Sequence, residues 1–197
     1  PLFVDKPFCY RKAEGKRFLA RAAELGVPIC SYSVLPKQQS FINFKRKMRS
    51  LGKIHSLVST GPCDIKSKHG GVFFYGIHQV DMVLNLLGYD MAYGEVVRGT
   101  GKNHAGVITY KSGAVASMNL VGEGSARFHL SAIGDKGRLD EYISFDENTY
   151  LSGTRTFCRM FKTGKTSETA ETMLGPVAAL EALEKSISKG SRVRITL

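Results

Sequence analysis

Residues 69–88, HGGVFFYGIHQVDMVLNLLG, hold the chain's most suggestive pair of chemically active side chains. His78 and Asp81 are three residues apart, which makes them neighbours on one face if the segment is helical. A carboxylate that accepts an imidazole N–H fixes the ring tautomer and leaves the other nitrogen free to exchange a proton. A packing or capping pair has the same spacing, so the pattern alone leaves both interpretations open.

The segment has the apolar period of a helix. A core-facing stripe is formed by Ile77, Val80, Leu84 and Leu87. A second, polar stripe, about 100° further round the helix, is formed by His78, Asp81 and Asn85. This pattern predicts that the polar groups lie at the edge of the buried face. The preceding Gly70 and Gly71 indicate a close approach of the backbone to another strand or to a ligand.

The elements before this helix predict a strand–helix–strand unit. Residues 2–4 and 27–33 are short apolar runs, and residues 11–26 have a helical pattern ending at Gly26. Two strands joined through a helix are parallel, with a right-handed crossover. A second helix over 35–52, a strand over 53–61 and a polar loop over 61–69 complete the first half.

The second half is rich in short β-type runs. Runs separated by glycine turns occupy residues 93–146, and residues 154–164 are predicted to add a further strand. A helix over 175–190 and a strand over 191–197 close the chain. The fold class is therefore α+β, with a mainly antiparallel open sheet covered by helices on one face. We expect the uncovered face of residues 91–162, including Val107, Val115 and Leu120, to form a homo-oligomer.

Composition narrows the class of protein. Lys and Arg number 28 against 17 Asp and Glu, but the densest basic run, residues 45–49, has no nucleic-acid-binding motif around it. Nucleic-acid binding is therefore disfavoured. No apolar run reaches the roughly 18 residues of a membrane span. The start has no signal-like pattern, and its opening LFV resembles a strand entered midway, so we expect a piece of a longer chain.

Metal and disulfide chemistry have no support in the sequence. The four cysteines form no CxxC pair, and the five histidines show no metal-ligand spacing. We therefore expect reduced thiols in a cytoplasmic protein and no metal site.

Several segments together resemble the Gfo/Idh/MocA oxidoreductases. LFVDKPF resembles the family's E-K-P segment, and GGVFFYGIHQVDMVLNLLG resembles its G-G-x-x-x-D-x-G-x-H-x-x-D helix. AIGDKGRL and VAALEALEKSISKGSRVRI resemble the later turn in the sheet and the closing helix and strand. The segments occur in the family's order across essentially the whole chain.

The resemblance implies a division of the chain and a set of site residues. Residues 1–33 would be the end of a dinucleotide-binding Rossmann domain, and residues 34–197 the substrate-binding and oligomerisation domain. Lys6 falls on the E-K-P lysine, which with Pro7 would lie at the cofactor. His78 falls on the histidine that acts on the substrate hydroxyl. Its neighbours Tyr75 and Asp81 are expected to bind substrate.

Two departures from the family pattern concern the site directly. Asp5 stands where the family has Glu, and Phe74 stands where it has the Asp of D-x-G-x-H. The usual G-Y-x-x-R pattern is missing from SYSVLP. No G-x-G-x-x-G phosphate loop occurs in the sequence, so the main binding loop for NAD or NADP is absent.

The function implied by the resemblance is the oxidation or reduction of a sugar, polyol or inositol-like hydroxyl with NAD or NADP. In this view His78 removes the hydroxyl proton as a base of near-neutral pKa, and Lys6 stabilises the alkoxide. The alternative is a non-catalytic relative that senses a sugar or binds a partner, which Phe74 favours because phenyl relays no proton.

Overall fold

The computed structural model describes all residues, 1–197, and its N-terminal part is a small βαβ unit. Strand β1 (Leu2–Phe3), helix α1 (Lys12–Glu24) and strand β2 (Ile29–Cys30) follow one another, and the two strands pair in parallel. The predicted strand–helix–strand unit is confirmed. A small apolar cluster joins it to the rest of the chain, formed by Ala22, Ile29 and Met173. The boundary predicted near residue 34 stays a prediction.

The larger part is a seven-stranded sheet in the order β8-β7-β3-β6-β5-β4-β9. Only β3 and β6 are parallel, and the other neighbours are antiparallel, which confirms the predicted fold class. The strands are β3 (Ile54–Pro62), β4 (Met91–Arg98), β5 (Asn103–Tyr110), β6 (Val115–Val121), β7 (His129–Gly134), β8 (Gly137–Tyr142) and β9 (Val193–Arg194).

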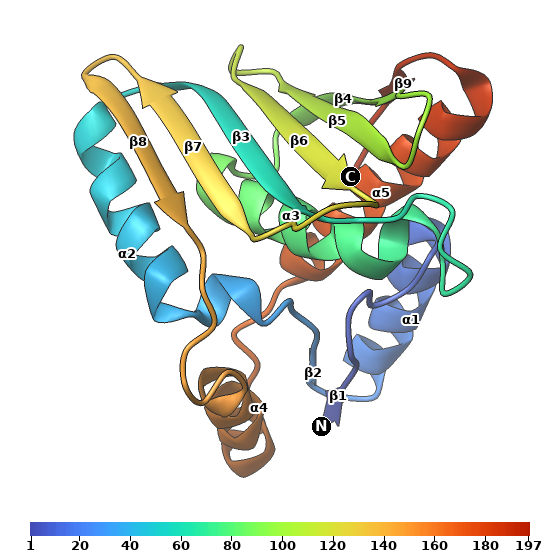
Figure 1. Ribbon diagram of the computed structural model, residues 1–197. Helices are drawn as coiled ribbons and strands as arrows, with labels where there is room; N and C mark the ends of the chain where they lie inside the picture. Colours follow the sequence, from blue (N-terminus) through green and yellow to red (C-terminus); the bar gives the residue numbers. More distant parts are fainter.

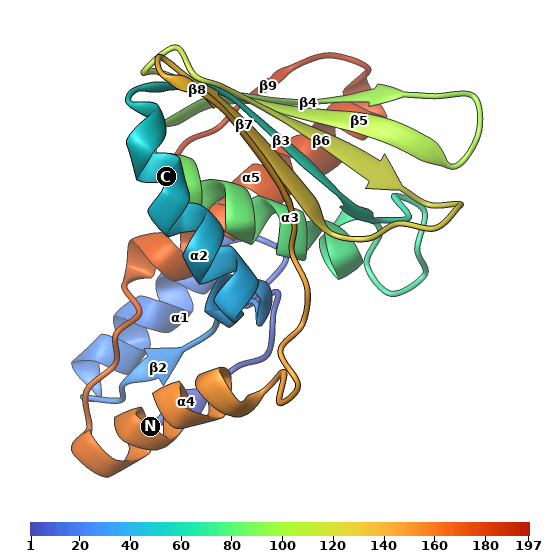
Figure 2. The ribbon, with the colours of Figure 1, turned by 60° about the vertical axis from the view of Figure 1, so that its left-hand side comes forward.

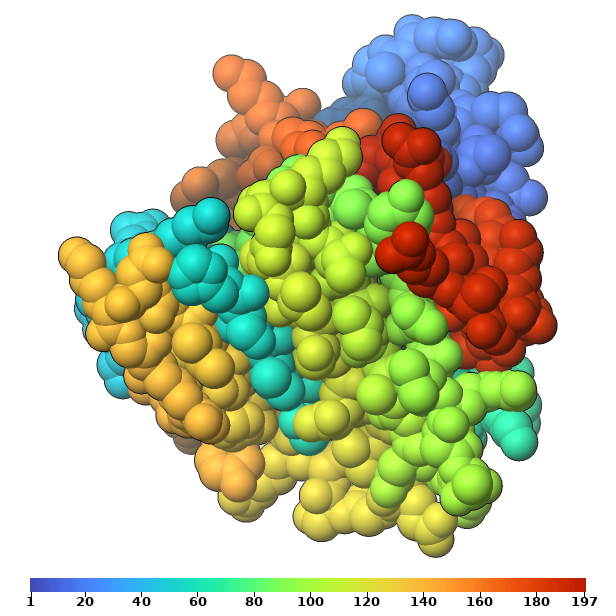
Figure 3. All heavy atoms as spheres, turned by 90° about the horizontal axis from the view of Figure 1, so that it is seen from above, coloured from blue at the N-terminus to red at the C-terminus, as the bar shows by residue number.

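Helices cover one face of this sheet. The covering helices are α2 (Gln39–Met48), α3 (Val72–Leu87) and α5 (Ala170–Lys189), with short 3₁₀ turns η1 (Leu35–Lys37) and η2 (Arg49–Leu51) at either end of α2. Figure 1 shows α3 and α5 beneath the strands and α2 beside β8. The main core lies between these layers, and the opposite face of the sheet, seen from above in Figure 3, carries no helix.

The uncovered face differs from the prediction in one residue. Val107 and Val115 are half-buried members of it, but Leu120 is 1% exposed and points into the core with Ala116 and Met118. Side chains alternate between the two faces of a strand, so positions 115 and 120, an odd number apart, lie on opposite faces.

The strand predicted over 154–164 is wrong. Residues 151–163 form helix α4 (Leu151–Thr163), which ends at Gly164 in the left-handed conformation. Gly153, Phe157 and Met160 recur at helical spacing on the side that faces the protein, so the period is 3.6 rather than 2. Figure 2 shows α4 apart from the sheet, beside the N-terminus of the chain. The Phe3 and Phe157 rings pack there, 5.2 Å apart.

Candidate active site

Helix α3 starts at the double glycine, and the close approach predicted there is internal to the chain. A Cβ on Gly71 would lie 3.1 Å from the Ile65 carbonyl oxygen. A Cβ on Gly70 would lie 2.8 Å from the Tyr10 hydroxyl. Both glycines have positive φ angles, 122° and 58°, which side-chain-bearing residues rarely adopt. The glycines therefore allow the turn into α3 and its contact with Tyr10.

The polar stripe of α3 is more deeply buried than predicted. His78 and Asp81 are each only 7% exposed, although the pattern predicted positions at the edge of the core. The sheet and α5 pack on two sides of the helix. Residues 31–35, which follow β2, close the third side through contacts with both polar groups. A single helix pattern does not reveal this third layer.

Ser33 lies between the two predicted partners. Its Oγ is 2.8 Å from His78 Nδ1, and its backbone N–H donates to Asp81 Oδ2 at 2.9 Å. The predicted direct His78–Asp81 hydrogen bond is replaced by these two bonds to Ser33. Sequence reasoning did not single out Ser33, because nothing in SYS marks a residue that reaches a helix 45 positions later.

The surroundings of Ser33 decide the tautomer of His78. Ser33 is 1% exposed, and its Oγ accepts the Leu35 N–H at 3.3 Å. His78 Nδ1 is the one acceptor within reach of the Ser33 hydroxyl proton. A buried hydroxyl proton without an acceptor costs about 1–3 kcal/mol, so Ser33 donates to Nδ1. The ring proton of neutral His78 is then on Nε2.

Burial shifts both titratable groups toward their neutral forms. Burial, with a smaller contribution from the Lys6 ammonium, lowers the pKa of His78 to about 4. Burial raises the pKa of Asp81 to about 7, against the opposing hydrogen bond from the Ser33 N–H. The expectation that His78 is a base of near-neutral pKa is therefore wrong: at neutral pH it is an uncharged imidazole.

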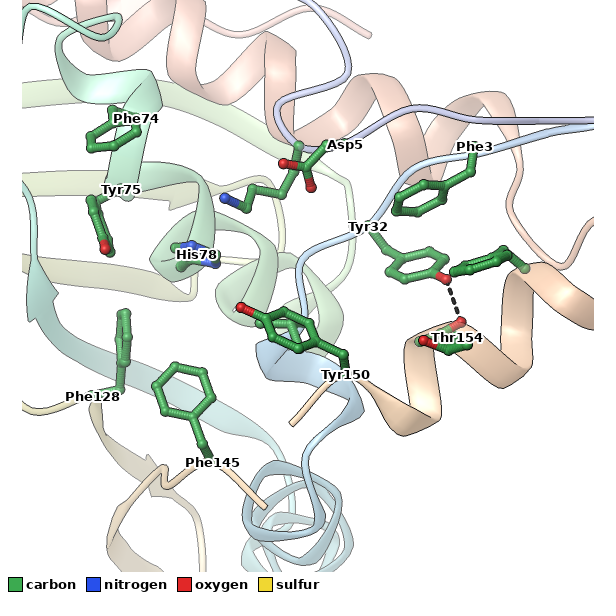
Figure 4. A pocket seen from close by; sticks show the side chains of 14 residues that line it. Phe3, Asp5, Tyr32, Phe74, Tyr75, His78, Phe128, Phe145, Tyr150 and Thr154 are labelled. Atoms are coloured by element: carbon green, nitrogen blue, oxygen red, sulfur yellow. Dashed lines mark hydrogen bonds between the residues drawn. The ribbon is translucent and has the colours of Figure 1, made fainter. Parts of the chain in front are cut away.

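His78 opens onto a cleft of about 520 Å³ between the βαβ unit, α3, α4 and the end of β8. The predicted residues Lys6, Tyr75 and His78 all line it. Figure 4 shows Tyr75 and His78 on one side, Asp5 above them, and Tyr32 with Phe3 on the other side. The complete lining is Phe3, Asp5, Lys6, Tyr32, Val34, Phe74, Tyr75, His78, Phe128, Phe145, Tyr150, Gly153, Thr154 and Phe157.

Two of the predicted site residues do not line this cleft. Pro7 follows Lys6 and is half-buried. Asp81 faces a separate polar cavity of about 100 Å³, which Asn85 and Glu168 also line. Asn85 Nδ2 donates to Asp81 Oδ1 at 3.2 Å. The predicted substrate contact of Asp81 has no support in this geometry, because Ser33 lies between Asp81 and His78.

Phe74, which takes the place of the family's Asp, lies at the cleft. It is 38% exposed, and its ring packs 5.0 Å from both His69 and Tyr75. Aromatic residues from distant parts of the chain also contribute, notably Phe128, Phe145 and Tyr150. Their types gave no sequence signal, since aromatic residues are ordinary core components. No group of three or more His, Cys, Asp or Glu side chains is placed to hold a metal ion.

All four cysteines are free thiols, two of them buried and two, Cys9 and Cys158, partly exposed. None of the helices combines the length and the hydrophobicity that a membrane-spanning helix requires.

The chain is similar to known proteins in structure but not detectably in sequence. The sequence matches no protein-family model and no curated protein at a significant level. The fold is similar to that of GenD2 from gentamicin A biosynthesis in complex with NAD, with a TM-score of 0.82 and 16% identity, over 99% of this chain and 71% of that one. It is also similar to a myo-inositol dehydrogenase from Corynebacterium glutamicum, with a TM-score of 0.82 and 13% identity, over 100% and 73%. A scyllo-inositol dehydrogenase from Lactobacillus casei is similar too, with a TM-score of 0.79 and 15% identity, over 98% of this chain and 71% of that one.

These likenesses define the class of fold. The chain has the fold of Gfo/Idh/MocA-type dehydrogenases, over a portion of somewhat less than three quarters of their length. The resemblance read from the sequence is confirmed at the level of the fold.

Proposed function

We propose that the chain is the substrate-side portion of an NAD(P)-dependent oxidoreductase, which transfers hydride between the nicotinamide and a hydroxyl-bearing carbon of a small molecule. The observation that carries the proposal is the convergence of Lys6 and His78 on one cleft. Lys6 follows β1 and His78 is on α3, so two separate parts of the fold supply them. The inositol dehydrogenases of similar fold favour a sugar, polyol or inositol-like hydroxyl as the first substrates to test.

The residues present fit the nicotinamide end of the cofactor. Asp5 and Lys6 follow β1, and Tyr32 follows β2, so the cleft opens at the carboxyl ends of two parallel strands. That edge is where ligands bind in open α/β sheets. Lys6 and Pro7 would lie at the cofactor, which supplies the hydride acceptor or donor when bound. Residues for the pyrophosphate are not in this sequence, so residues 1–197 alone should bind NAD(P) weakly.

The mechanism follows from the tautomer and charge of the two groups. His78 Nε2–H donates a hydrogen bond to the substrate oxygen, and the Lys6 ammonium stabilises negative charge on that oxygen. In the direction of alcohol oxidation, the hydroxyl proton leaves to water as the hydride is transferred, and in the direction of reduction water returns it. His78 thus orients and polarises the oxygen, and Lys6 stabilises the negative charge that develops on it.

The test uses the complete protein with NAD or NADP and a panel of alcohols, and follows the absorbance of the reduced nicotinamide. Turnover that is lost in Lys6→Met supports the proposal. The exposed Lys16→Met, on the outer side of α1, is the matched control and should keep full activity. Absence of turnover with every alcohol and both cofactors would contradict the proposal.

A second candidate function is favoured by Phe74. A phenyl ring replaces the family's carboxylate at the cleft, so the protein would bind a small molecule without oxidising it. Saturable binding of an alcohol to the complete protein, with no change in nicotinamide absorbance over hours, would select this function instead.

We also propose that the uncovered face of the sheet joins copies of the chain. Half-buried Val58, Val107 and Val115 lie on it among polar residues. Val107→Lys should shift the species seen by light scattering at tens of micromolar toward the monomer. Thr156→Lys, on α4, should not. A wild-type monomer at these concentrations would contradict the proposal.

A further inference from the structure

The cleft is walled by aromatic rings on both sides. On the α3 side the rings form a continuous series, with centroid distances of 5.0, 5.6, 5.9 and 6.3 Å, running through Phe74, Tyr75, His78, Phe128 and Phe145. On the other side Phe3 lies 5.5 Å from Tyr32 and 5.2 Å from Phe157. Figure 4 shows the two walls with the cleft between them. Any molecule in this cleft therefore contacts ring surfaces.

Hydrogen-bonding groups in the cleft are few. The lining contains one carboxylate, Asp5, one amine, Lys6, the side-chain hydroxyls of Tyr75, Tyr150 and Thr154, and no Asn, Gln, Glu or Arg. The Tyr32 hydroxyl is already used, because it donates to the Gly153 carbonyl oxygen at 2.6 Å. A polyol carries a hydroxyl on nearly every carbon, and each one that leaves water needs a partner. The α3 wall offers such partners only at Tyr75 and His78.

The place of His78 within the ring series determines what flanks the reacting carbon. Tyr75 is 5.6 Å from His78 on one side and Phe128 is 5.9 Å on the other. An oxygen that accepts from His78 Nε2 brings its carbon beside these two rings. The groups attached to that carbon therefore lie against ring surfaces, where flat apolar groups pack best.

Resting on the proposed function, we infer that the substrate is a secondary alcohol, or the corresponding ketone, of low hydroxyl content, with an aryl or other flat apolar ring directly attached to the reacting carbon. The aromatic walls hold the ring, and Lys6 with His78 holds the single reacting oxygen. Such a substrate needs no polar partners beyond those the cleft supplies.

Binding to the 197-residue chain tests this inference without the cofactor. The probes are 1-phenylethane-1,2-diol and myo-inositol, titrated by saturation-transfer NMR. We expect the phenyl diol to bind at least about tenfold more tightly. Phe145→Ala should weaken its binding by about fivefold to tenfold. Phe161→Ala is the matched control, because Phe161 is 54% exposed, Phe145 is 52% exposed, and only Phe145 lines the cleft.

Three results would overturn the inference: equal or tighter binding of myo-inositol, an unchanged affinity in Phe145→Ala, or displacement of the phenyl diol by an equal concentration of nicotinamide. The last would assign the α3 wall to the cofactor ring. The turnover assay of the complete protein gives a separate answer. Turnover of inositol without phenyl-diol binding would contradict only the inferred substrate class. Phenyl-diol binding without turnover of any alcohol would contradict only the proposed oxidoreductase function.

Discussion

Ser33 forms hydrogen bonds with two residues of α3, His78 on the side of the cleft and Asp81 on the opposite side. Their positions in the sequence are similar, but their pKa values shift in opposite directions. His78 and Asp81 are three residues apart on α3 and equally exposed, at 7%. Burial lowers the pKa of His78 to about 4 and raises the pKa of Asp81 to about 7. Both shifts favour the neutral form, but His78 opens onto the aromatic cleft and Asp81 onto a smaller polar cavity. Equal burial therefore leaves His78 at the larger cleft, whereas Asp81 keeps its hydrogen bonds to Ser33 and Asn85.

The largest expected effect is on the cleft side. In the complete protein, His78→Ala should lower kcat by about 10²–10³ while KM changes far less, because the Nε2–H bond strengthens as charge develops on the substrate oxygen. Asp81→Asn is the matched change on the other side and should leave kcat within about threefold. Steady-state kinetics at saturating cofactor measure both. Equal losses of kcat in the two variants would show that the sides are not functionally distinct.

The next effect concerns stability, and here Asp81 is the more informative residue. The folded chain keeps the Asp81 proton up to about pH 7, whereas an unfolded chain loses it near the ordinary value of 3.8. The folded state binds more protons between these values, so this group makes stability fall as pH rises, by up to about 4 kcal/mol. His78 does the reverse: the unfolded chain is protonated up to 6.5 and the folded chain only to about 4, so stability rises with pH over that window.

These two trends oppose each other between pH 4 and 6.5 in the wild type. Asp81→Asn should expose the histidine trend, so that the free energy of unfolding rises by about 3 kcal/mol across this window. Urea denaturation at several pH values measures it. Asp140→Asn is the control, because Asp140 is an exposed acid whose pKa is lowered by its hydrogen bond from Arg138. This variant keeps Asp81, so the opposing trends of Asp81 and His78 should still offset each other. A flat stability profile in Asp81→Asn would contradict the assigned shifts.

A smaller effect is expected from Ser33, the residue between the two sides. Ser33→Ala leaves His78 Nδ1 without a donor inside the protein, and we expect kcat to fall by about 10- to 100-fold. Ser33→Thr keeps the hydroxyl and should restore kcat, although its extra methyl group lowers the melting temperature in a tight site. Ring ¹⁵N signals of His78 should show Nε2 protonated in the wild type and a mixture of tautomers in Ser33→Ala. A single Nε2–H tautomer in Ser33→Ala would contradict the role of Ser33.

The contrast between His78 and Asp81 also shows which features of the fold and the site can be predicted from the sequence. The periods and glycine stops predicted the βαβ unit, helix α3 and the mainly antiparallel sheet, because each is specified locally. Lys6, Tyr75 and His78 were placed by the resemblance, and the structure brings them to one cleft. Ser33 and the direction of Asp81 could not be predicted, since they depend on how residues 31–35 pack against a helix far along the chain.

Two other differences have separate physical origins. Residues 154–164 are predicted as a strand because their β-branched and aromatic residues suit strands, whereas contacts with Phe3 and Tyr32 support the helical face of α4. These tertiary contacts outweigh the local preference. Leu120 and Val115 are predicted on one face, but they are five residues apart in one continuous strand, so alternation places them on opposite faces.

The smallest expected effect is at Tyr75, and it refines the cleft side of the comparison. Tyr75 is 41% exposed, and its ring lies 5.6 Å from His78 while its hydroxyl makes no hydrogen bond within the protein. Tyr75→Phe keeps the ring wall and removes only the hydroxyl. If that hydroxyl contacts substrate, as predicted, KM should rise by about three- to tenfold with kcat and melting temperature unchanged, because a neutral hydrogen bond is worth about 0.5–1.5 kcal/mol. Tyr142→Phe, at the last residue of β8 and not part of the cleft lining, should change neither constant. An unchanged KM in Tyr75→Phe would mean that Tyr75 serves the cleft only through its ring, which would leave His78 as the sole polar group of the α3 wall.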